Sequence, residues 1–398
     1  MGYHPGMTPT EVTARLRKPL ERALSQGHPW IYRDALDPLA AEPGTVVAVT
    51  DARGRFVARG IADAGPLAVR VYTTRDEVLG PALLTGRMVR AAELRDRVLP
   101  PETDAYRLLH GEGDRLPGVV CDVYGPWAVL ALDGEGMIPW RESLVGVLSP
   151  VLRARGVTSL LVRSGRGDRR VTDLAWGELP DGPMDVRERG MLLRVDLVRG
   201  QKTGAFLDQR ESRHRVRRLA GGMRVLNLYG YTGGFSVAAG LGGAGSVETV
   251  DVAPAAVALA TEAWAHNGLD PARHTATVCD VPELLAERLR ARARYDLVVA
   301  DPPSFAPSEA TLEAALRSYR ALHAAALGLV SPGGYYLAGS CSSHVDRSVF
   351  LGTVLDGAAK LRRVLQVVDA WAAPEDHPRL AAFPEGDYLK VLLLRVMD

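Results

Sequence analysis

From residue 191 onward, short apolar runs typical of buried strands alternate with helical patterns. The strand-like runs cover residues 224–229, 246–251, 275–278, 295–300, 334–339 and 388–395. Regular alternation of this kind predicts an α/β fold with a doubly wound parallel sheet. In open sheets of this class, ligands bind in the crevice outside the carboxyl ends of the strands. The residues that follow each run are therefore the first candidates for a functional site.

A glycine-rich segment follows the first of these runs. Residues 230–235 read Gly-Tyr-Thr-Gly-Gly-Phe and lead into a helix expected over residues 236–241. Glycines let the backbone approach a ligand closely, and a helix N-terminus offers free N–H groups to an anion. The segment lacks the G-x-G-x-x-G pattern of dinucleotide-binding loops. A loop that binds the methionyl carboxylate of S-adenosylmethionine needs fewer glycines, and this carboxylate can accept a hydrogen bond from Thr232. We therefore predict this cofactor.

Acidic residues follow the next strands in turn. Asp251 ends the second run, where an acid can bind ribose hydroxyls, and Asp280 follows the third run, where it can accept from an adenine amine. A purely structural glycine-rich turn explains these recurring acids poorly. The predicted cofactor contacts are Asp208, Arg210, Tyr229, Tyr231, Thr232, Gly233, Gly234, Asp251, Val252, Asp280, Val281 and Asp301.

Two further motifs follow strand-like runs and predict the chemistry. Residues 301–305 read Asp-Pro-Pro-Ser-Phe, and residues 340–342 read Ser-Cys-Ser, so a carboxylate and a thiol are expected at one rim. A thiolate that adds to carbon 6 of cytosine makes carbon 5 able to attack a sulfonium methyl group. A base then removes the carbon-5 proton, and the thiol is eliminated.

In this scheme Cys341 is the predicted nucleophile, and Asp301 bonds to the N3/N4 edge of the base. The proton-removing base is either a water or Asp301 itself. Cys279 is the rival thiol, although its place beside Asp280 suggests a wall of the cofactor site. The alternative interpretation of Cys341 is a buried core cysteine.

A basic segment precedes the glycine-rich loop. Asp208 and Glu211 are expected to cap the start of a basic helix over residues 210–219. Arginines spread around this helix, so a single solvated face does not explain them. We predict a cofactor or RNA role for Lys202 and Arg210, and RNA contact for Lys202 and Arg213.

The N-terminal third contains a second basic and aromatic pattern. Residues 12–74 read as short strands broken by Gly and Pro, which predicts a small β-rich module. Cationic side chains flank Trp30 and Tyr32, and such a pattern can grip a nucleic-acid backbone and stack bases. Trp30 is the predicted RNA contact; core packing is the alternative. A connecting helix is expected near residues 80–100 and an α/β unit over residues 106–186, with a basic loop of Arg163, Arg166, Arg169 and Arg170.

Composition narrows the remaining possibilities. The formal net charge of the 398 residues is +1, so only local basic clusters argue for a polyanionic partner. The 3 cysteines form neither a disulfide framework nor a zinc spacing, which predicts a reducing cytoplasm and no metal. The sequence shows neither a signal-peptide pattern nor an apolar run of the roughly 18 residues that a membrane span needs, so neither export nor a membrane is expected.

Together the motifs resemble those of the bacterial 23S ribosomal RNA cytosine-C5 methyltransferases. The matching stretches are residues 202–210, 225–235, 301–305 and 340–342, with further matches at residues 28–30, 111–118, 376–378 and 384–390. The resemblance implies class I S-adenosylmethionine-dependent methylation of 23S ribosomal RNA and a homodimer. It also implies an N-terminal PUA RNA-binding domain (residues 1–80), a small central α/β domain (81–188) and a Rossmann-like methyltransferase domain (189–398). Ser304 departs from the family, whose members often carry Lys there.

Two other functions fit part of these patterns. A guanine N-methyltransferase shares the Lys-Thr-Gly and Asp-Pro-Pro motifs but needs no nucleophilic thiol. A non-catalytic RNA-binding factor of ribosome assembly needs only the cofactor pocket. Substitution of Cys341 by Ala should leave a guanine N-methyltransferase mostly active and should inactivate a cytosine-C5 methyltransferase. Methyl incorporation into ribosomal RNA would exclude the non-catalytic factor.

Overall fold

The computed structural model describes residues 11–165, 170–306 and 309–398, so Arg166 and Arg169 of the predicted basic loop lie outside the described residues. The described chain forms two compact units. Unit 1 comprises the described residues up to Leu99, together with Ala105–Asp181 and Glu375–Gly386. Unit 2 comprises Pro100–Asp104, Gly182–Pro374 and Asp387–Asp398.

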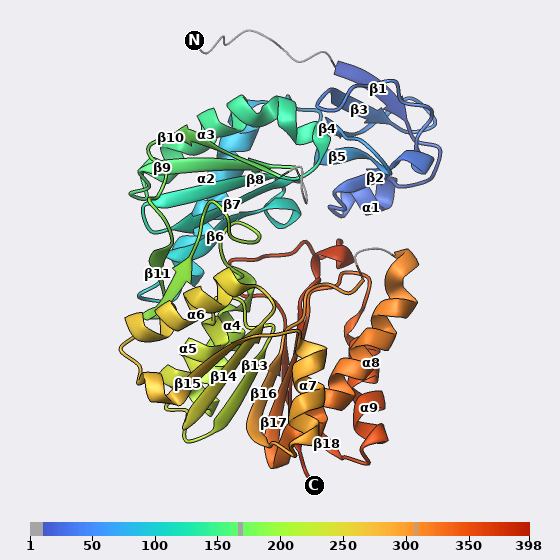
Figure 1. Ribbon diagram of the computed structural model, residues 1–398. Helices are drawn as coiled ribbons and strands as arrows, with labels where there is room; N and C mark the ends of the chain where they lie inside the picture. The colour runs from blue at the N-terminus through green and yellow to red at the C-terminus, as the bar shows by residue number, and fades with distance from the viewer. Residues whose placement is uncertain (1–10, 166–169, 307–308) are drawn as a thin grey trace. The chain divides into compact units, whose positions relative to one another are not determined.

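The first sheet of unit 1 has five strands in the order β1-β3-β4-β5-β2 (Figure 1). Strand β1 is parallel to β3, and the other neighbours are antiparallel. The β-rich module expected over residues 12–74 is therefore confirmed. Its elements are β1 (Glu11–Arg15), α1 (Glu21–Ser25), β2 (Trp30–Tyr32), η1 (Arg33–Ala35), β3 (Val46–Thr50), β4 (Phe56–Ala62) and β5 (Leu67–Thr73).

The second sheet of unit 1 has the order β10-β9-β8-β7-β6, and only β8 and β9 are parallel. Every side chain of the edge strand β10 is exposed or half-buried. The elements are α2 (Pro81–Val98), β6 (Ala105–His110), η2 (Gly111–Asp114), β7 (Val119–Tyr124), β8 (Trp127–Leu132), η3 (Glu135–Trp140), α3 (Arg141–Arg153), β9 (Ser159–Ser164) and β10 (Val171–Trp176).

The two sheets of unit 1 share buried apolar residues. Ile61 and Tyr72 of the first sheet lie in the same core cluster as Met88 of α2 and Leu130 of β8. A distant segment, Glu375–Gly386, belongs to this unit and ends in η8 (Pro384–Gly386). A β-carbon at position 113 would lie 1.8 Å from the carbonyl oxygen of Pro378, so only glycine lets this segment pack there.

Unit 2 is built on a seven-stranded sheet in the order β15-β14-β13-β16-β17-β19-β18. Strand β19 is antiparallel to both of its neighbours, and the first five strands are parallel. A separate hairpin, β11 (Met184–Glu188) and β12 (Met191–Val195), precedes the sheet. The sheet strands are β13 (Arg224–Leu228), β14 (Ser246–Asp251), β15 (His274–Val278), β16 (Tyr295–Ala300), β17 (Val330–Ser340), β18 (Leu365–Trp371) and β19 (Lys390–Val396).

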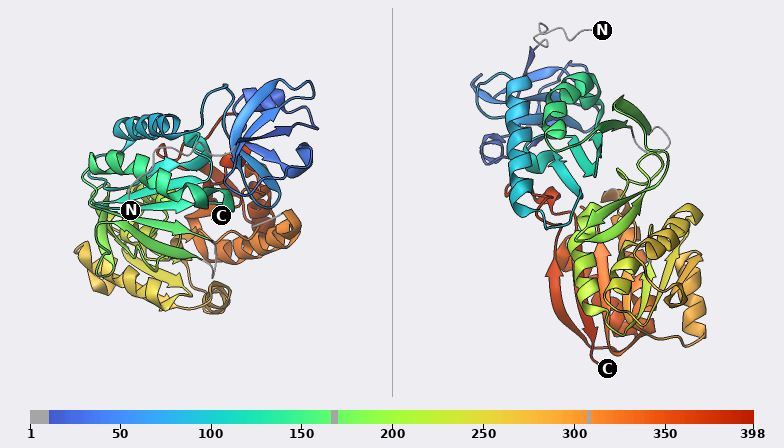
Figure 2. Two further views of the ribbon diagram at one scale, coloured as in Figure 1. Left: turned by 90° about the horizontal axis from the view of Figure 1, so that it is seen from above. Right: turned by 90° about the vertical axis from the view of Figure 1, so that its left-hand side faces the viewer.

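Helices cover both faces of this sheet, as a doubly wound fold requires. One layer contains α4, α5 and α6, and the other contains α7, α8 and α9 (Figures 1 and 2). The predicted α/β fold is therefore confirmed, but the sequence analysis missed the edge strand β18, whose residues are mostly exposed. The helical elements are η5 (Leu207–Gln209), α4 (Arg210–Leu219), α5 (Gly234–Leu241), α6 (Pro254–His266), η6 (Pro271–Arg273), α7 (Val281–Arg290), η7 (Glu309–Thr311), α8 (Leu312–Leu329) and α9 (Arg347–Lys360).

Candidate active site

The carboxyl ends of the parallel strands meet at one edge of the sheet, and the loops that follow them line a cavity of unit 2. Parallel strands present these ends together, so residues far apart in the sequence converge here. The predicted site residues that line the cavity are Lys202, Asp208, Arg213, Tyr229, Tyr231, Thr232, Gly234, Asp251, Val252, Asp280, Val281, Asp301 and Cys341.

The loop between β13 and α5 turns sharply. Tyr229, Tyr231 and Gly233 have φ angles of 55°, 47° and 77°, which lie in the left-handed region. A β-carbon at Gly233 would lie 2.7 Å from the β-carbon of Ala260, so the loop packs against α6 only with glycine at this position. Gly233 itself does not line the cavity, and its role is to close the turn that brings Thr232 to the cavity wall.

Asp251 is held in one orientation by the loops around it. Its Oδ2 accepts from the backbone N–H of Tyr231 at 2.9 Å, and its Oδ1 accepts from the N–H of Ala253 at 2.9 Å. A carboxylate oxygen can accept more than one hydrogen bond, so the side chain keeps acceptor capacity for a ribose. Burial, followed by the charge of Asp280, raises the pKa of Tyr229 to about 12, so its phenol stays protonated.

Asp301 lies against the last residues of β17. Ala300 pairs with Ala338 across the parallel strands β16 and β17, which brings Asp301 beside Gly339. A β-carbon at position 339 would lie 2.4 Å from Oδ1 of Asp301, so glycine makes room for the carboxyl group. Burial, and next the charge of Asp208, raise the pKa of Asp301 to about 7 against the opposing effect of Lys202. Near neutral pH this group can therefore either donate or accept a proton.

A network of hydroxyl groups fixes the loop that carries Cys341. The phenol of Tyr319 in α8 lies 2.9 Å from Oγ of Ser340 and 3.2 Å from Oγ of Ser342. The hydroxyl of Ser304 lies 3.0 Å from the same Ser342 hydroxyl. Ser304, which stands where members of the family often carry Lys, therefore links residues 301–305 to residues 340–342. Burial, and then the charge of Asp301, raise the pKa of the Cys341 thiol to about 11. The isolated thiol is therefore protonated at neutral pH.

The expected capping role of Asp208 is wrong. Gln209 occupies the N-cap position of α4 without a side-chain bond, and Asp208 lies in η5 before it. Oδ2 of Asp208 accepts from Nζ of Lys202 at 2.7 Å and from the hydroxyl of Tyr388 at 2.9 Å. This carboxylate therefore joins the segment around residues 202–208 to the distant Tyr388 at the cavity wall.

The structure corrects the expectations for two arginines of α4. Arg213 is buried, with Nε 2.6 Å from Oε1 of Glu188 and Nη2 2.5 Å from Oε2. Such a bidentate pair engages the guanidinium inside the protein, which argues against a direct contact with RNA. Arg210 is fully buried and does not line the cavity, contrary to its predicted cofactor contact.

Several cavity residues were not predicted. Phe206 and Gln209 lie in the basic segment that was singled out, and Pro302 and Pro303 directly follow Asp301, so their positions carried a signal. Leu193 and Leu389 also line the cavity, but an isolated leucine has no chemical signature. Only the tertiary fold brings these two residues to the site.

Trp30, the predicted RNA contact, is half-buried in unit 1. Its ring packs edge-on against Phe383 with centroids 4.6 Å apart, and its Nε1 donates to Oε1 of Glu112 at 3.0 Å. The indole ring and its Nε1 atom therefore both have a partner within unit 1. These contacts give Trp30 a structural role in unit 1, and RNA contact by this residue stays a prediction.

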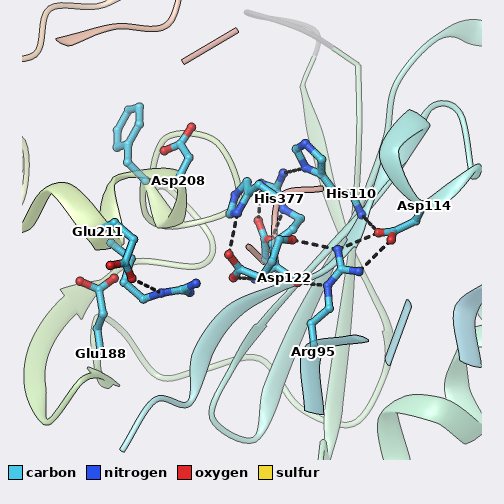
Figure 3. A network of polar contacts seen from close by, with 12 residues as sticks. Arg95, His110, Asp114, Asp122, Glu188, Asp208, Glu211 and His377 are labelled. Atoms are coloured by element: carbon cyan, nitrogen blue, oxygen red, sulfur yellow. Dashed lines mark hydrogen bonds and ion pairs between the residues drawn. The ribbon is translucent and has the colours of Figure 1, made fainter. Parts of the chain in front are cut away.

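A polar network next to this contact explains the Asp-His-Pro stretch at residues 376–378. Arg95 binds the carboxylate of Asp114 at 2.7 Å and the carbonyl of Asp376 at 2.8 Å (Figure 3). The rings of His110 and His377 lie 4.9 Å apart, and Nδ1 of His377 lies 2.9 Å from Oδ1 of Asp376. Burial lowers the pKa of His110 well below its ordinary value, so this imidazole is neutral. These contacts of residues 376–378 hold the segment Glu375–Gly386 in unit 1.

Comparison with known proteins identifies the family. Residues 153–395 match the S-adenosylmethionine-dependent methyltransferase family, and residues 14–74 match a PUA-like domain. The chain belongs to the S-adenosylmethionine-dependent methyltransferases. Ribosomal RNA large subunit methyltransferase I of Shewanella amazonensis is 35% identical over 97% of this chain and 99% of its own length. The enzyme of the same name from Salmonella arizonae is 35% identical over 96% of this chain and 97% of its own length.

Solved structures agree with this fold. A Streptococcus mutans protein described as a S-adenosylmethionine-dependent methyltransferase superposes with a TM-score of 0.87 at 24% identity, covering 97% of this methyltransferase and 100% of that chain. A second structure with the same scores is a complex with S-adenosylhomocysteine. The predicted cofactor and the Rossmann-like and PUA-like folds are therefore confirmed. The structure of Trm5b from Pyrococcus abyssi matches more weakly, with a TM-score of 0.52 at 16% identity over 97% of this chain and 100% of that chain.

No group of three or more His, Cys, Asp or Glu residues able to hold a metal ion occurs among residues 11–165, 170–306 and 309–398. In the same described ranges, no helix combines the length and apolar character needed to cross a membrane.

Proposed function

We propose that this methyltransferase modifies carbon 5 of a cytosine in 23S ribosomal RNA through a transient bond between Cys341 and carbon 6 of the base. The RNA substrate is inferred from relatives named ribosomal RNA large subunit methyltransferase I and from the PUA-like segment. One observation supports the chemistry above all others: Cys341 and Asp301 line the same cavity as Thr232 and Asp251 of the proposed cofactor site.

The donor set of the cavity fits S-adenosylmethionine. We assign Asp251 to the ribose hydroxyls, Asp280 to the adenine amine and Thr232 to the methionyl carboxylate. The remaining assigned contacts are Asp208, Tyr229, Tyr231, Gly234, Val252, Val281 and Asp301, which line the cavity around these three. When bound, the cofactor supplies a methyl group on a positively charged sulfur.

Asp301 and Cys341 divide the chemistry between them. The Cys341 thiolate adds to carbon 6, and the negative charge that develops on the ring spreads to N3. Asp301, whose pKa is raised to about 7, donates its proton to N3 and accepts from the N4 amine. Once carbon 5 carries the methyl group, water or the Asp301 carboxylate removes its proton. The carbon–sulfur bond then breaks, the thiolate is regenerated, and N3 releases the proton that it had received.

The test is methyl transfer to undermodified 23S ribosomal RNA by Cys341→Ala, with Cys279→Ala as the matched control. We expect Cys341→Ala to lose nearly all activity and to keep its affinity for S-adenosylhomocysteine, while Cys279→Ala stays active. A guanine N-methyltransferase would retain most activity without the thiol, and a non-catalytic factor would show none in the wild type. RNA that carries 5-fluorocytosine should trap the wild type as a denaturation-resistant adduct, since carbon 5 then has no proton to lose.

Two further properties are proposed with this function. Residues 1–80, 81–188 and 189–398 are assigned as PUA, central and methyltransferase domains, with RNA binding supported by the PUA-like match. We also propose a cytoplasmic homodimer; light scattering of the purified protein tests the dimer.

A further inference from the structure

Lys390 is a buried lysine that contacts the residues on either side of Cys341. Its backbone pairs with Ser340 across β17 and β19. Its Nζ donates to the carbonyl of Ser342 and, at 2.9 Å, to the carbonyl of Tyr388. Only 2% of the residue is exposed. One lysine therefore holds the residue before Cys341 through its backbone and the residue after it through its side chain.

The hydrogen bonds of this lysine do not neutralise its charge. Carbonyl groups accept hydrogen bonds but carry no net charge, and an ammonium group has three N–H donors for the two carbonyls. Within the described part of the chain, no carboxylate forms an ion pair with Lys390. The charged or titratable groups that face it are Cys341, Asp387, Asp346 and Arg347. Asp387 and Asp346 offset part of this buried charge, and Cys341 adds a further negative charge when it ionises. The charged groups that act on the thiol from the cavity are Asp301, Lys202 and Asp208.

We infer that the ammonium group of Lys390 is a second counter-charge, besides Lys202, that stabilises the thiolate of Cys341. Lys390 is thus a positioning residue of the proposed reaction, and the inference rests on that function because it gives the thiolate its task. The thiol proton leaves to water, the sulfur carries the negative charge, and the nearby cation lowers the free energy of this state. Coupling of this kind is reciprocal: a thiolate that stabilises the ammonium is stabilised by it to the same extent.

The charge is available at neutral pH. Burial lowers the pKa of Lys390 to about 8, and the thiolate of Cys341 opposes this by raising it. The ammonium form therefore predominates below about pH 8 and disappears above it. Its stabilising effect on the thiolate is present below that pH and declines as the lysine deprotonates.

The first experiment measures alkylation of Cys341 by iodoacetamide against pH, without RNA, in a Cys279→Ser background. An opposite charge nearby lowers a pKa by at least about one unit, so loss of the cation should leave about tenfold less thiolate. We expect Lys390→Met to slow alkylation about tenfold at pH 7.5 and Lys390→Arg to restore much of the rate. Lys360→Met, which removes an exposed lysine of α9, should have no effect. An unchanged rate in a folded Lys390→Met protein would overturn the inference.

A second experiment keeps the wild-type lysine and covers the case in which Lys390→Met does not fold. Iodoacetate places a negative carboxymethyl group on Cys341, whereas iodoacetamide places a neutral group of similar size there. The chain has only four lysines, at positions 18, 202, 360 and 390, so NMR of protein labelled at lysine 13Cε can follow each one. The pKa of Lys390 should be higher in the carboxymethyl protein. Equal values in the two adducts would contradict the coupling.

These outcomes are separate from the test of the proposed function. If Cys341→Ala keeps its methyl-transfer activity, the covalent mechanism fails even where the alkylation and NMR results show the coupling. If Cys341→Ala is inactive but Lys390→Met alkylates as fast as the wild type, the covalent mechanism stands and the inference about Lys390 fails.

Discussion

Substitution of Asp301 by Asn should stabilise this protein at the expense of its activity. The pKa of Asp301 is raised from 3.8 to about 7, chiefly by burial. Between these two values the native state binds a proton that the unfolded state has released, so stability falls as the pH rises through this window and is constant above it. A difference of about three units corresponds to about 4 kcal/mol at most. Asp301 is still partly exposed, and solvent screens its charge, so we expect about half of this value, about 2 kcal/mol.

Urea denaturation of the wild type and Asp301→Asn at pH 5 and pH 8 measures this effect. The variant should be more stable than the wild type at pH 8, and the difference should shrink at pH 5. Asp296→Asn is the matched control, because the hydrogen bond from Arg224 lowers the pKa of Asp296 and the same substitution should destabilise. If Asp301→Asn is no more stable than the wild type at pH 8, ionisation of the Asp301 carboxyl group does not destabilise the native state, and the raised pKa inferred from its burial is wrong.

Two other substitutions test separate parts of the site. Asp251→Ala should weaken the binding of S-adenosylhomocysteine at least about tenfold, because a ribose contact that also orients the Tyr231 loop is lost; calorimetry that gives an unchanged affinity would refute the assignment. Glu188→Ala leaves the buried guanidinium of Arg213 without its carboxylate and should cost about 3–5 kcal/mol of stability. A loss below about 1 kcal/mol in urea denaturation would show that this pair is not the buried anchor described above.

Local patterns were sufficient for the strands that carry the site. The run that ends at Ala300 is buried along most of its length, and in unit 2 every buried parallel strand ends at the same sheet edge. Asp251, Asp280, Asp301 and Cys341 could therefore be expected together without knowledge of any side-chain contact. The edge strand β18 escaped detection because an exposed edge needs no continuous apolar run.

The sequence did not predict the contacts of side chains whose partners are distant in the sequence. Asp208 meets the hydroxyl of Tyr388, which lies 180 residues further along the chain. Trp30 packs against Phe383, and Arg213 pairs with Glu188 across 25 residues. Near each of these residues, basic or aromatic neighbours suggested ligand contacts. Nothing in the local sequence indicated the partner that the fold provides.

The order of residues alone determined the α/β sheet, the glycine-rich turn and the types of chemical group at its rim, since periodicity and residue type depend only on near neighbours. The tertiary structure decided the protonation of these groups, because burial and the nearness of unlinked charges set each pKa. It made Asp301 a weak acid near pH 7 and placed Lys390, on the antiparallel strand β19, across from the cysteine loop. Both effects arise from long-range packing, which no local pattern encodes.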